Sequence, residues 1–274
     1  MADILEEIVA HKRVEVAERK QILPQNRLEQ ALVAYLEEGR HTVISIKESL
    51  RSSRSGIIAE FKRRSPSKGW IKAEGRADQI PLSYAQNGAS ALSILTDSKY
   101  FGGSLSYLEI ARGFVSSTPI LRKDFIIEDY QLYEARLAGA DAVLLIAADL
   151  TKAECRKLAA TAHSIGLETL LEIHTESELD YVGENIDMVG VNNRNLGTFH
   201  TDVANSYRLA SLLPKDYVLV SESGISDPKT VRELRDAGFR GFLIGETFMK
   251  SADPGSSLRA FITAVESAAG EQFS

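Results

Sequence analysis

An acid and an amine lie two residues apart at the end of the first apolar strand that the sequence predicts. The strand begins at Ile57, and Glu60 and Lys62 stand near its end. Side chains alternate between the two faces of a strand, so Glu60 and Lys62 share a face with Ile58, whereas Phe61 lies on the other face. An ordinary core strand carries no such pair. We therefore predict that this strand opens into an active site, where a carboxylate and an ammonium transfer protons.

Further polar groups follow the later apolar runs of the chain. They stand where six more strands are predicted to end: Thr96 and Asp97; Arg122, Lys123 and Asp124; Glu172 and His174; Asn192, Asn193 and Arg194; Glu222 and Ser223; and Gly245 and Glu246. Charged groups that meet at one edge of a sheet shift the pKa values of one another. A buried network of structural salt bridges is the alternative for any one residue, but active-site chemistry explains the whole set better.

Glycines after the last two predicted strands indicate a phosphate site. Gly224 follows the seventh strand and Gly245 follows the eighth, just before a short helix near Thr247. Backbone N–H groups at such a place can hold an anion, and barrel enzymes often bind phosphate there. Glycine after a strand can also be only a turn, so it is the location that favours a phosphate.

The elements that must position these residues repeat along the chain. Apolar, β-like runs begin near residues 57, 91, 119, 142, 168, 188, 217 and 241. Helical patterns follow them at residues 79–86, 104–114, 128–138, 151–163, 176–181, 203–212, 228–236 and 256–267. Strands that alternate with helices pair in parallel through right-handed crossovers. The pattern predicts an α/β fold, a (β/α)8 TIM barrel, rather than an open doubly wound sheet.

Two more helices are predicted before the first strand. Asp3 and Glu6 are typical of a helix start, and apolar residues at helical spacing continue until Pro24. A second, shorter helix ends at Gly39. Since no linker divides the chain, we predict a single domain, 1–274, in which a helical N-terminal extension (1–48) lies across one end of the barrel (56–270).

Composition excludes several classes of function. The 274 residues are 44% hydrophobic and 26% charged, and the formal net charge of -6 argues against binding nucleic acid, which attracts an excess of lysine and arginine. The single cysteine, Cys155, permits no internal disulfide, and the five histidines lack the spacing of metal ligands. No apolar run approaches the ~20 residues that span a membrane, and the N-terminus does not resemble a secretory signal. We expect a cytoplasmic protein without a metal site.

These motifs resemble those of indole-3-glycerol-phosphate synthase, an enzyme family of the tryptophan pathway. The segment EFKRRSPSKG, which begins at Glu60, is close to the most specific motif of the family. Five later motifs match in order: ILRKDF, LEIH, GVNNRNL, SESGI and IGE. The match covers essentially the whole chain, including the N-terminal helices. The resemblance implies ring closure of 1-(2-carboxyphenylamino)-1-deoxyribulose 5-phosphate, with loss of CO₂ and water and with no cofactor.

The resemblance also implies a role for each polar residue. Lys123 resembles the general acid that protonates the ketone oxygen, and Lys62 binds the substrate carboxylate or shares the proton delivery. Dehydration then uses Glu172 and Glu60 as base and acid, with Asn192 orienting Glu60. Glu222 fixes the amine or the lysines. Substrate binding is assigned to the polar partners Arg194 and Ser223, the phosphate contacts Ser65, Gly224 and Gly245, and an apolar slot for the anthranilate ring made by Phe101, Phe125 and Leu144. Some members of the family carry a small hydroxyl residue at the position of Glu246, so here the phosphate relies on backbone donors.

Three alternative functions fit the same barrel. Phosphoribosylanthranilate isomerase acts on a neighbouring intermediate, but it needs one acid and one base, and two lysines with three glutamates exceed that need. A Schiff-base lyase or aldolase would use Lys123 as its nucleophile. A non-catalytic phosphate-binding barrel would require a broken set of acids and bases. As partners we expect a small phosphorylated substrate, neither nucleic acid nor membrane, and a monomer, with a weak dimer or contact with other tryptophan-pathway enzymes as the alternative.

Overall fold

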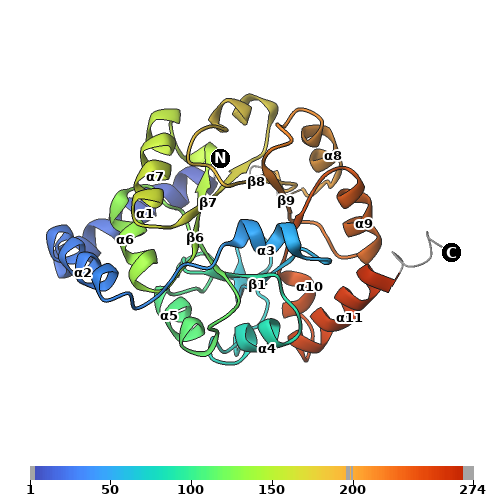
Figure 1. The fold of residues 1–274 in the computed structure, drawn as a ribbon, viewed down its shortest axis with the longest axis horizontal. Helices are drawn as coiled ribbons and strands as arrows, with labels where there is room; N and C mark the ends of the chain where they lie inside the picture. The colour runs from blue at the N-terminus through green and yellow to red at the C-terminus, as the bar shows by residue number, and fades with distance from the viewer. Residues whose placement is uncertain (1–3, 196–197, 199, 268–274) are drawn as a thin grey trace.

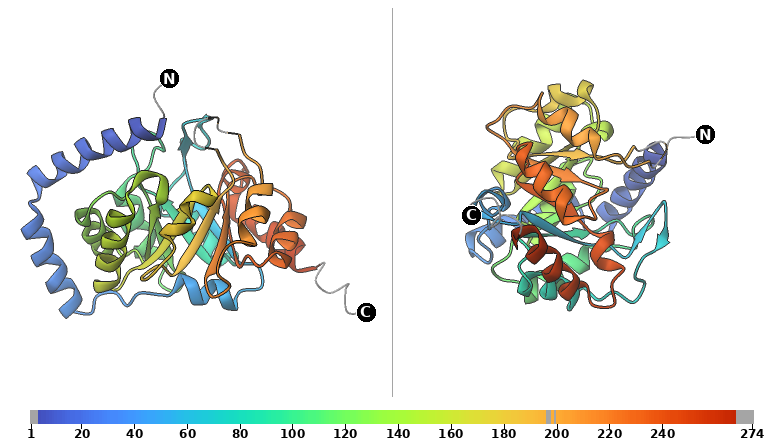
Figure 2. Two further views of the ribbon diagram at one scale, coloured as in Figure 1. Left: turned by 90° about the horizontal axis from the view of Figure 1, so that it is seen from above. Right: turned by 90° about the vertical axis from the view of Figure 1, so that its right-hand side faces the viewer.

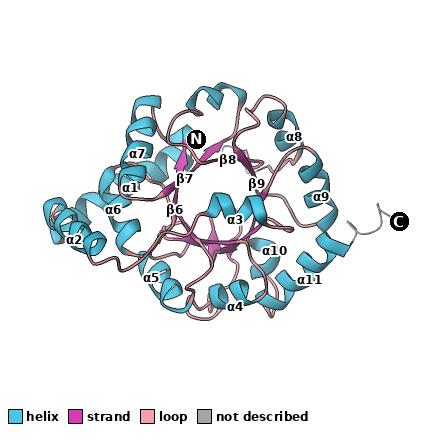
Figure 3. Cartoon of the chain, in the orientation of Figure 1, coloured by secondary structure: helices cyan, strands magenta, loops and turns pink. Residues whose placement is uncertain are grey.

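The computed structural model describes residues 4–195, 198 and 200–267. Within them, eight parallel strands close into a barrel that helices surround (Figures 1 and 3). The barrel strands are β1 (Ile57–Phe61), β4 (Ala91–Leu95), β5 (Ile120–Lys123), β6 (Ala142–Ile146), β7 (Glu168–Ile173), β8 (Met188–Asn192), β9 (Val218–Glu222) and β10 (Gly241–Ile244). β1 pairs with both β4 and β10, which closes the sheet. The prediction of a (β/α)8 barrel is confirmed, and each strand starts within one residue of its predicted position.

Helices cover the outer surface of the barrel, close to the predicted positions. They are α4 (Ile80–Gln86), α5 (Leu105–Phe114), α6 (Asp129–Leu137), α7 (Lys152–Ser164), α8 (Ala204–Ala210), α9 (Pro228–Asp236), α10 (Glu246–Met249) and α11 (Pro254–Ser267). The segment at 176–181 is a 3-10 helix, η2 (Glu176–Tyr181), and η1 (Ala147–Asp149) follows β6. None of the helices in the described part of the chain is long and apolar enough to cross a membrane.

The alternation of side chains along each strand separates two apolar layers. Ile57 and Phe61 of β1 belong to the outer cluster, which also contains helix residues such as Leu108. Ile58 belongs to the inner cluster, which fills the barrel together with side chains such as Leu144. The inner face of β1 therefore carries apolar bulk in the middle of the barrel and polar groups at its carboxyl end, as expected for a packed barrel with its site at one end.

Three helices precede the barrel, one more than the sequence analysis predicted. They are α1 (Ile4–Ile22), α2 (Gln25–Glu37) and α3 (Ile46–Ser52). In Figure 2, α1 crosses one end of the barrel and α3 lies under the other. Ile46 and Leu50 of α3 join the inner cluster and so close the amino-terminal end of the barrel. Because α3 spans the predicted boundary at residue 48, only α1 and α2 lie wholly within the predicted extension.

The segment after β1 forms a hairpin that the sequence analysis did not predict. Its two short strands, β2 (Arg64–Ser65) and β3 (Gly69–Trp70), are antiparallel. The backbone N–H of Arg64 donates to the carbonyl of Phe101 at 3.1 Å. The Trp70 ring packs so closely over Gly102 that a Cβ at this glycine would lie 2.8 Å from it. The hairpin is thereby fixed against the loop between β4 and α5, beside the carboxyl ends of the strands.

Candidate active site

A cavity of about 550 Å³ opens at the carboxyl ends of the barrel strands. Its wall includes all the predicted site residues except one: Glu60, Lys62, Ser65, Phe101, Lys123, Phe125, Leu144, Glu172, Asn192, Arg194, Ser223, Gly224, Gly245 and Glu246. The exception is Glu222, which is fully buried and contacts Lys123 from beneath the cavity. Segments that are far apart in the sequence therefore converge on a single space.

Four charged side chains form one layer at the floor of the cavity, and we call them the charged layer: Glu60, Lys123, Glu172 and Glu222. They come from β1, β5, β7 and β9, which are alternate strands of the barrel. In a closed barrel the side chains of one inner layer come from alternate strands. The strand order alone therefore brings these four residues to the same height.

The Lys123 ammonium is the centre of the charged layer. Its Nζ lies 2.5 Å from Glu222 Oε2 and 3.6 Å from Glu172 Oε2. Burial lowers the pKa of Lys123, but the negative charges of Glu222, Glu172 and Glu60 outweigh it and raise that pKa above its ordinary value. The lysine is therefore a charged ammonium that can donate hydrogen bonds into the cavity.

Glu172 is held as a carboxylate by its neighbours. Burial raises the pKa of Glu172. The charge of Lys123 and hydrogen bonds from His174 and Asn192 lower it by more, so the pKa lies well below the usual range of a glutamate. The Asn192 amide donates to Glu172 Oε1 at 3.0 Å. The expectation that Asn192 orients Glu60 is wrong in this structure, because β8 pairs with β7, the strand that carries Glu172. His174 lies 3.3 Å from Glu172.

Glu60 lies in β1 and Lys62 directly after it, and the two side chains meet, as the strand alternation predicted. The Lys62 Nζ lies 2.6 Å from Glu60 Oε1. The space for this carboxylate comes from Gly245, directly after β10, where a Cβ would lie 2.4 Å from Glu60 Oε1. A glycine on the adjacent strand is therefore needed for Glu60 to reach the cavity.

Gly190 on β8 makes room for Glu222 in the same way. A Cβ at this position would lie 2.2 Å from Glu222 Oε1. We expect Gly190→Ala to turn the carboxylate away from Lys123, to lower kcat about tenfold or more and to cost roughly 1–3 kcal/mol of unfolding free energy as an overpacked core. Steady-state kinetics and urea unfolding measure both effects. Gly113→Ala is the matched control because its Cβ would enter open space, and equal kcat values for the two variants would contradict the prediction.

Glu222 carries a pKa that links protonation to stability. Burial and the charge of Glu172 raise the pKa of Glu222 to about 7, although Lys123 acts in the opposite direction. Between about pH 4.5 and 7 the folded chain therefore keeps a proton that the unfolded chain releases, and the free energy of unfolding falls as the pH rises. Glu172 is ionised in both states only in the upper part of this window, above about pH 5.5, and adds no slope there.

The variant Glu222→Gln is expected to remove this part of the pH dependence. The pKa difference corresponds to a loss on the order of 3 kcal/mol across the window in the wild type, at 1.36 kcal/mol per unit. Urea unfolding at pH 5, 6, 7 and 8 measures the slope. Glu48→Gln on the surface serves as the control. An unchanged slope in Glu222→Gln would show that this carboxyl is already ionised at pH 5.

The end of the cavity where the sequence predicts a phosphate lies beyond β9 and β10. Ser223 and Gly224 both adopt positive φ, at 67° and 78°, and this turn makes them part of the cavity wall. Glu246 pairs with Lys68 at 2.5 Å and also with Lys250. The sequence analysis did not single out these two lysines. A signal existed for each, since Lys68 lies in the SPSKG segment and Lys250 stands one helical turn after Glu246.

The opposite side of the cavity is apolar. The rings of Phe101 and Phe125 lie 6.0 Å apart and are tilted by 39°, and Leu144 also lines this side. The sequence analysis missed the contribution of α1, whose Ile4 and Ile8 also line the cavity. Helical spacing predicted an apolar stripe on α1, but the surface that the stripe covers depends on how the helix docks.

Comparison with known proteins identifies a family. The family model described as indole-3-glycerol phosphate synthase matches residues 5–261. An indole-3-glycerol phosphate synthase from Bacteroides thetaiotaomicron is 60% identical over 269 residues, which are 97% of this chain and 100% of the relative. Another, from a Polaromonas species, is 41% identical over 265 residues and covers 94% of this chain and 97% of its own.

Solved structures with a similar fold are distant in sequence. Tryptophan synthase subunit alpha from Legionella pneumophila has a TM-score of 0.59 at 14% identity, over 82% of this chain and 98% of its own. The 3-hexulose-6-phosphate synthase from Salmonella typhimurium has a TM-score of 0.62 at 11% identity, over 77% and 98%. These two likenesses concern the barrel alone. The family match and the two relatives decide the assignment: the chain belongs to the indole-3-glycerol phosphate synthase family, the carboxy-lyases of tryptophan biosynthesis.

Proposed function

We propose that Lys123 is the general acid of the ring closure that converts 1-(2-carboxyphenylamino)-1-deoxyribulose 5-phosphate to indole-3-glycerol phosphate. The observation that carries this proposal is the position of its ammonium, 2.5 Å from Glu222 and 3.6 Å from Glu172 below an open cavity. The new bond joins an aromatic carbon to the ketone carbon, and negative charge develops on the ketone oxygen. A preorganised ammonium stabilises that charge and donates the proton.

The carboxylates complete the reaction. After CO₂ leaves, the electron pair of the broken bond restores the aromatic ring. The hydroxyl formed from the ketone then takes up a proton and departs as water, while the neighbouring CH₂ of the new ring loses a proton, so that the C=C bond of the pyrrole forms. Glu172 is ionised and acts as the base that takes the proton from this CH₂. Glu60 faces the cavity and is the candidate for the acid. Glu222 holds the Lys123 ammonium in position.

The substrate lies across the cavity with its two ends in different surroundings. The anthranilate ring occupies the slot between Phe101, Phe125 and Leu144, and Lys62 binds its carboxylate. Arg194 and Ser223 contact the sugar hydroxyls. The phosphate lies near Ser65, Gly224, Gly245 and Glu246, where Lys68 and Lys250 supply positive charge.

The direct test is incubation of the protein with the carboxyphenylamino-deoxyribulose phosphate while indole fluorescence is recorded. We expect fluorescence to appear without any added cofactor, with one CO₂ released per indole formed. Absence of fluorescence would contradict the proposal. Borohydride trapping separates the Schiff-base alternative, because only that reaction leaves a covalent adduct on Lys123.

The proposal extends to the partners and the location of the protein. The family implies a small phosphorylated substrate. We place the protein in the cytoplasm as a monomer that binds neither nucleic acid nor membrane, in keeping with its net charge of -6. Light scattering across a concentration series tests the monomer against a weak dimer, and the same measurement with other tryptophan-pathway enzymes tests a contact with them.

A further inference from the structure

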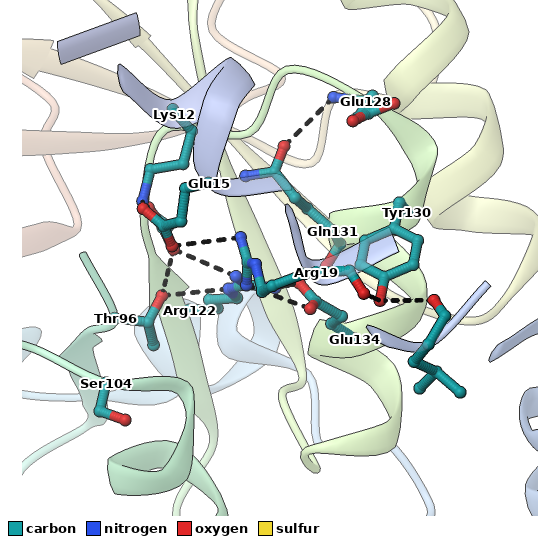
Figure 4. A network of polar contacts seen from close by, with 12 residues as sticks. Lys12, Glu15, Arg19, Thr96, Ser104, Arg122, Glu128, Tyr130, Gln131 and Glu134 are labelled. Atoms are coloured by element: carbon teal, nitrogen blue, oxygen red, sulfur yellow. Dashed lines mark hydrogen bonds and ion pairs between the residues drawn. The ribbon is translucent and has the colours of Figure 1, made fainter. Parts of the chain in front are cut away.

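A fully buried lysine of α1 joins the N-terminal helix to the barrel. The Nζ of Lys12 lies 2.9 Å from each of three carboxylates, those of Glu15, Asp97 and Asp124. Figure 4 shows this part of α1, with Lys12 and Glu15 beside the end of β4 and the Arg122 network. Asp97 and Asp124 stand just after β4 and β5, so a single ammonium connects two strand ends to the helix above them.

Each of the two aspartates also holds the backbone of a cavity aromatic. Asp97 Oδ1 accepts hydrogen bonds from the N–H groups of Tyr100, at 2.8 Å, and Phe101, at 3.2 Å. Asp124 Oδ1 accepts from the N–H of Phe125 at 2.9 Å. Asp97 therefore links Lys12 to the backbone of Phe101, and Asp124 links it to the backbone of Phe125. The rings of these two residues lie 6.0 Å apart at the apolar side of the cavity.

The partners of Lys12 are themselves fixed. Asp124 Oδ2 accepts from Thr96 Oγ1 at 2.6 Å and pairs with Arg122 at 3.1 Å. The loop that carries Phe101 makes a second contact with α1, since the Tyr100 hydroxyl donates to Glu7 at 2.9 Å. Asp124 and the loop that carries Phe101 are therefore held in place by further hydrogen bonds in addition to their contact with Lys12.

Stability alone does not explain a buried charge at this position. Taking an ammonium out of water is costly, and buried ion pairs are frequently no more stabilising than apolar residues of similar volume. Apolar residues in place of Lys12 and its buried partners could therefore join α1 to the barrel at no loss of stability. An apolar side chain at position 12 could not hold two negatively charged groups at a fixed distance from each other.

We propose that Lys12 is a positioning residue that sets the spacing of Phe101 and Phe125 and thereby the affinity of the enzyme for the aromatic ring of its substrate. This inference rests on the proposed ring slot and adds a residue that does not touch the substrate. Lys12 acts on the ring end of the cavity and leaves the phosphate end, at β9 and β10, unaffected.

The test uses two probes that differ in the aromatic ring. One is the alcohol obtained by reducing the ketone of the substrate, which binds without reacting, and the other is ribitol 5-phosphate, which lacks the ring. In Lys12→Met, which keeps the length of the side chain and removes its charge, we expect the Kd of the ring-bearing probe to rise at least tenfold. The Kd of ribitol 5-phosphate should stay within twofold. Lys20→Met on the same helix is the matched control, and both Kd values should match the wild type.

A second variant keeps the proposal testable in case Lys12→Met does not fold. The double variant Lys12→Met/Asp97→Asn also removes the negative charge of Asp97, and the amide oxygen of the asparagine still accepts the loop N–H groups. We expect this variant to fold and to show the same loss of affinity for the ring-bearing probe alone. Equal weakening of both probes, or no change in either, would overturn the proposal. Phe101→Ala tests the slot separately, because an unchanged affinity for the ring-bearing probe in that variant would reject the slot and the proposal with it.

Discussion

Replacing Lys123 by alanine is expected to lower kcat at least about 100-fold while KM stays within a few fold of the wild type. The ammonium acts on charge that appears only in the transition state, so its removal affects the chemical step more than substrate binding. Alanine also leaves three carboxylates of the charged layer facing one another. Initial rates of indole fluorescence over a range of substrate concentrations separate kcat from KM.

Lys62→Ala is the matched comparison for this variant. If Lys62 binds the substrate carboxylate, its removal raises KM more than it lowers kcat. Thermal melts of both variants verify that the barrel remains folded. A kcat near the wild-type value in Lys123→Ala would remove this lysine from the mechanism, and a large fall in kcat for Lys62→Ala alone would transfer the role of acid to Lys62.

Deleting residues 2–40 is expected to weaken substrate binding while the barrel still melts cooperatively. The deletion removes α1 and α2 but keeps His41, whose ring pairs with Asp141 and whose carbonyl accepts from Arg136. Loss of the apolar side chains that α1 places in the cavity wall should raise KM about tenfold or more, since each buried side chain of this kind contributes roughly 1.5–3 kcal/mol.

The same deletion tests the division of the chain into an extension (1–48) and a barrel (56–270). The melting temperature should fall, because Asp97 and Asp124 lose the Lys12 ammonium. Differential scanning calorimetry of the truncated protein gives the shape of the transition. A broad melt without cooperativity would mean that the N-terminal helices are part of one folding unit with the barrel.

The strand and helix order of the barrel could be predicted because it depends on local patterns. Apolar runs, helical spacing and glycines at the junctions recur with each unit, and each barrel strand starts within one residue of its prediction. The helix α3 was missed although its start carries a local signal, since Ser45 caps it by accepting the N–H of Glu48. Glu168, more than 100 positions away, also accepts hydrogen bonds from the N–H groups of Ile46 and Lys47, and no local pattern reveals that partner.

The candidate site shows the same limit. The membership of the charged layer follows from the rule that strand ends meet at one edge, so the polar residues there could be named from the sequence. Their pairing could not be named, as the contact of Asn192 with Glu172 shows. Lys12 carried no signal at all, because a lysine on an amphipathic helix is normally exposed and becomes buried only when tertiary partners surround it.

The glycines at 190 and 245 have a consequence for redesign of this barrel. The four members of the charged layer come from β1, β5, β7 and β9. Gly190 on β8 and Gly245, directly after β10, carry only hydrogen where a Cβ would collide with Glu222 or Glu60. New activities are therefore accessible by exchanging the four members of the charged layer for one another or for other polar side chains. A reactive group placed at 190 or 245 would instead require a simultaneous truncation of Glu222 or Glu60, so these strands accept new chemistry only through paired substitutions.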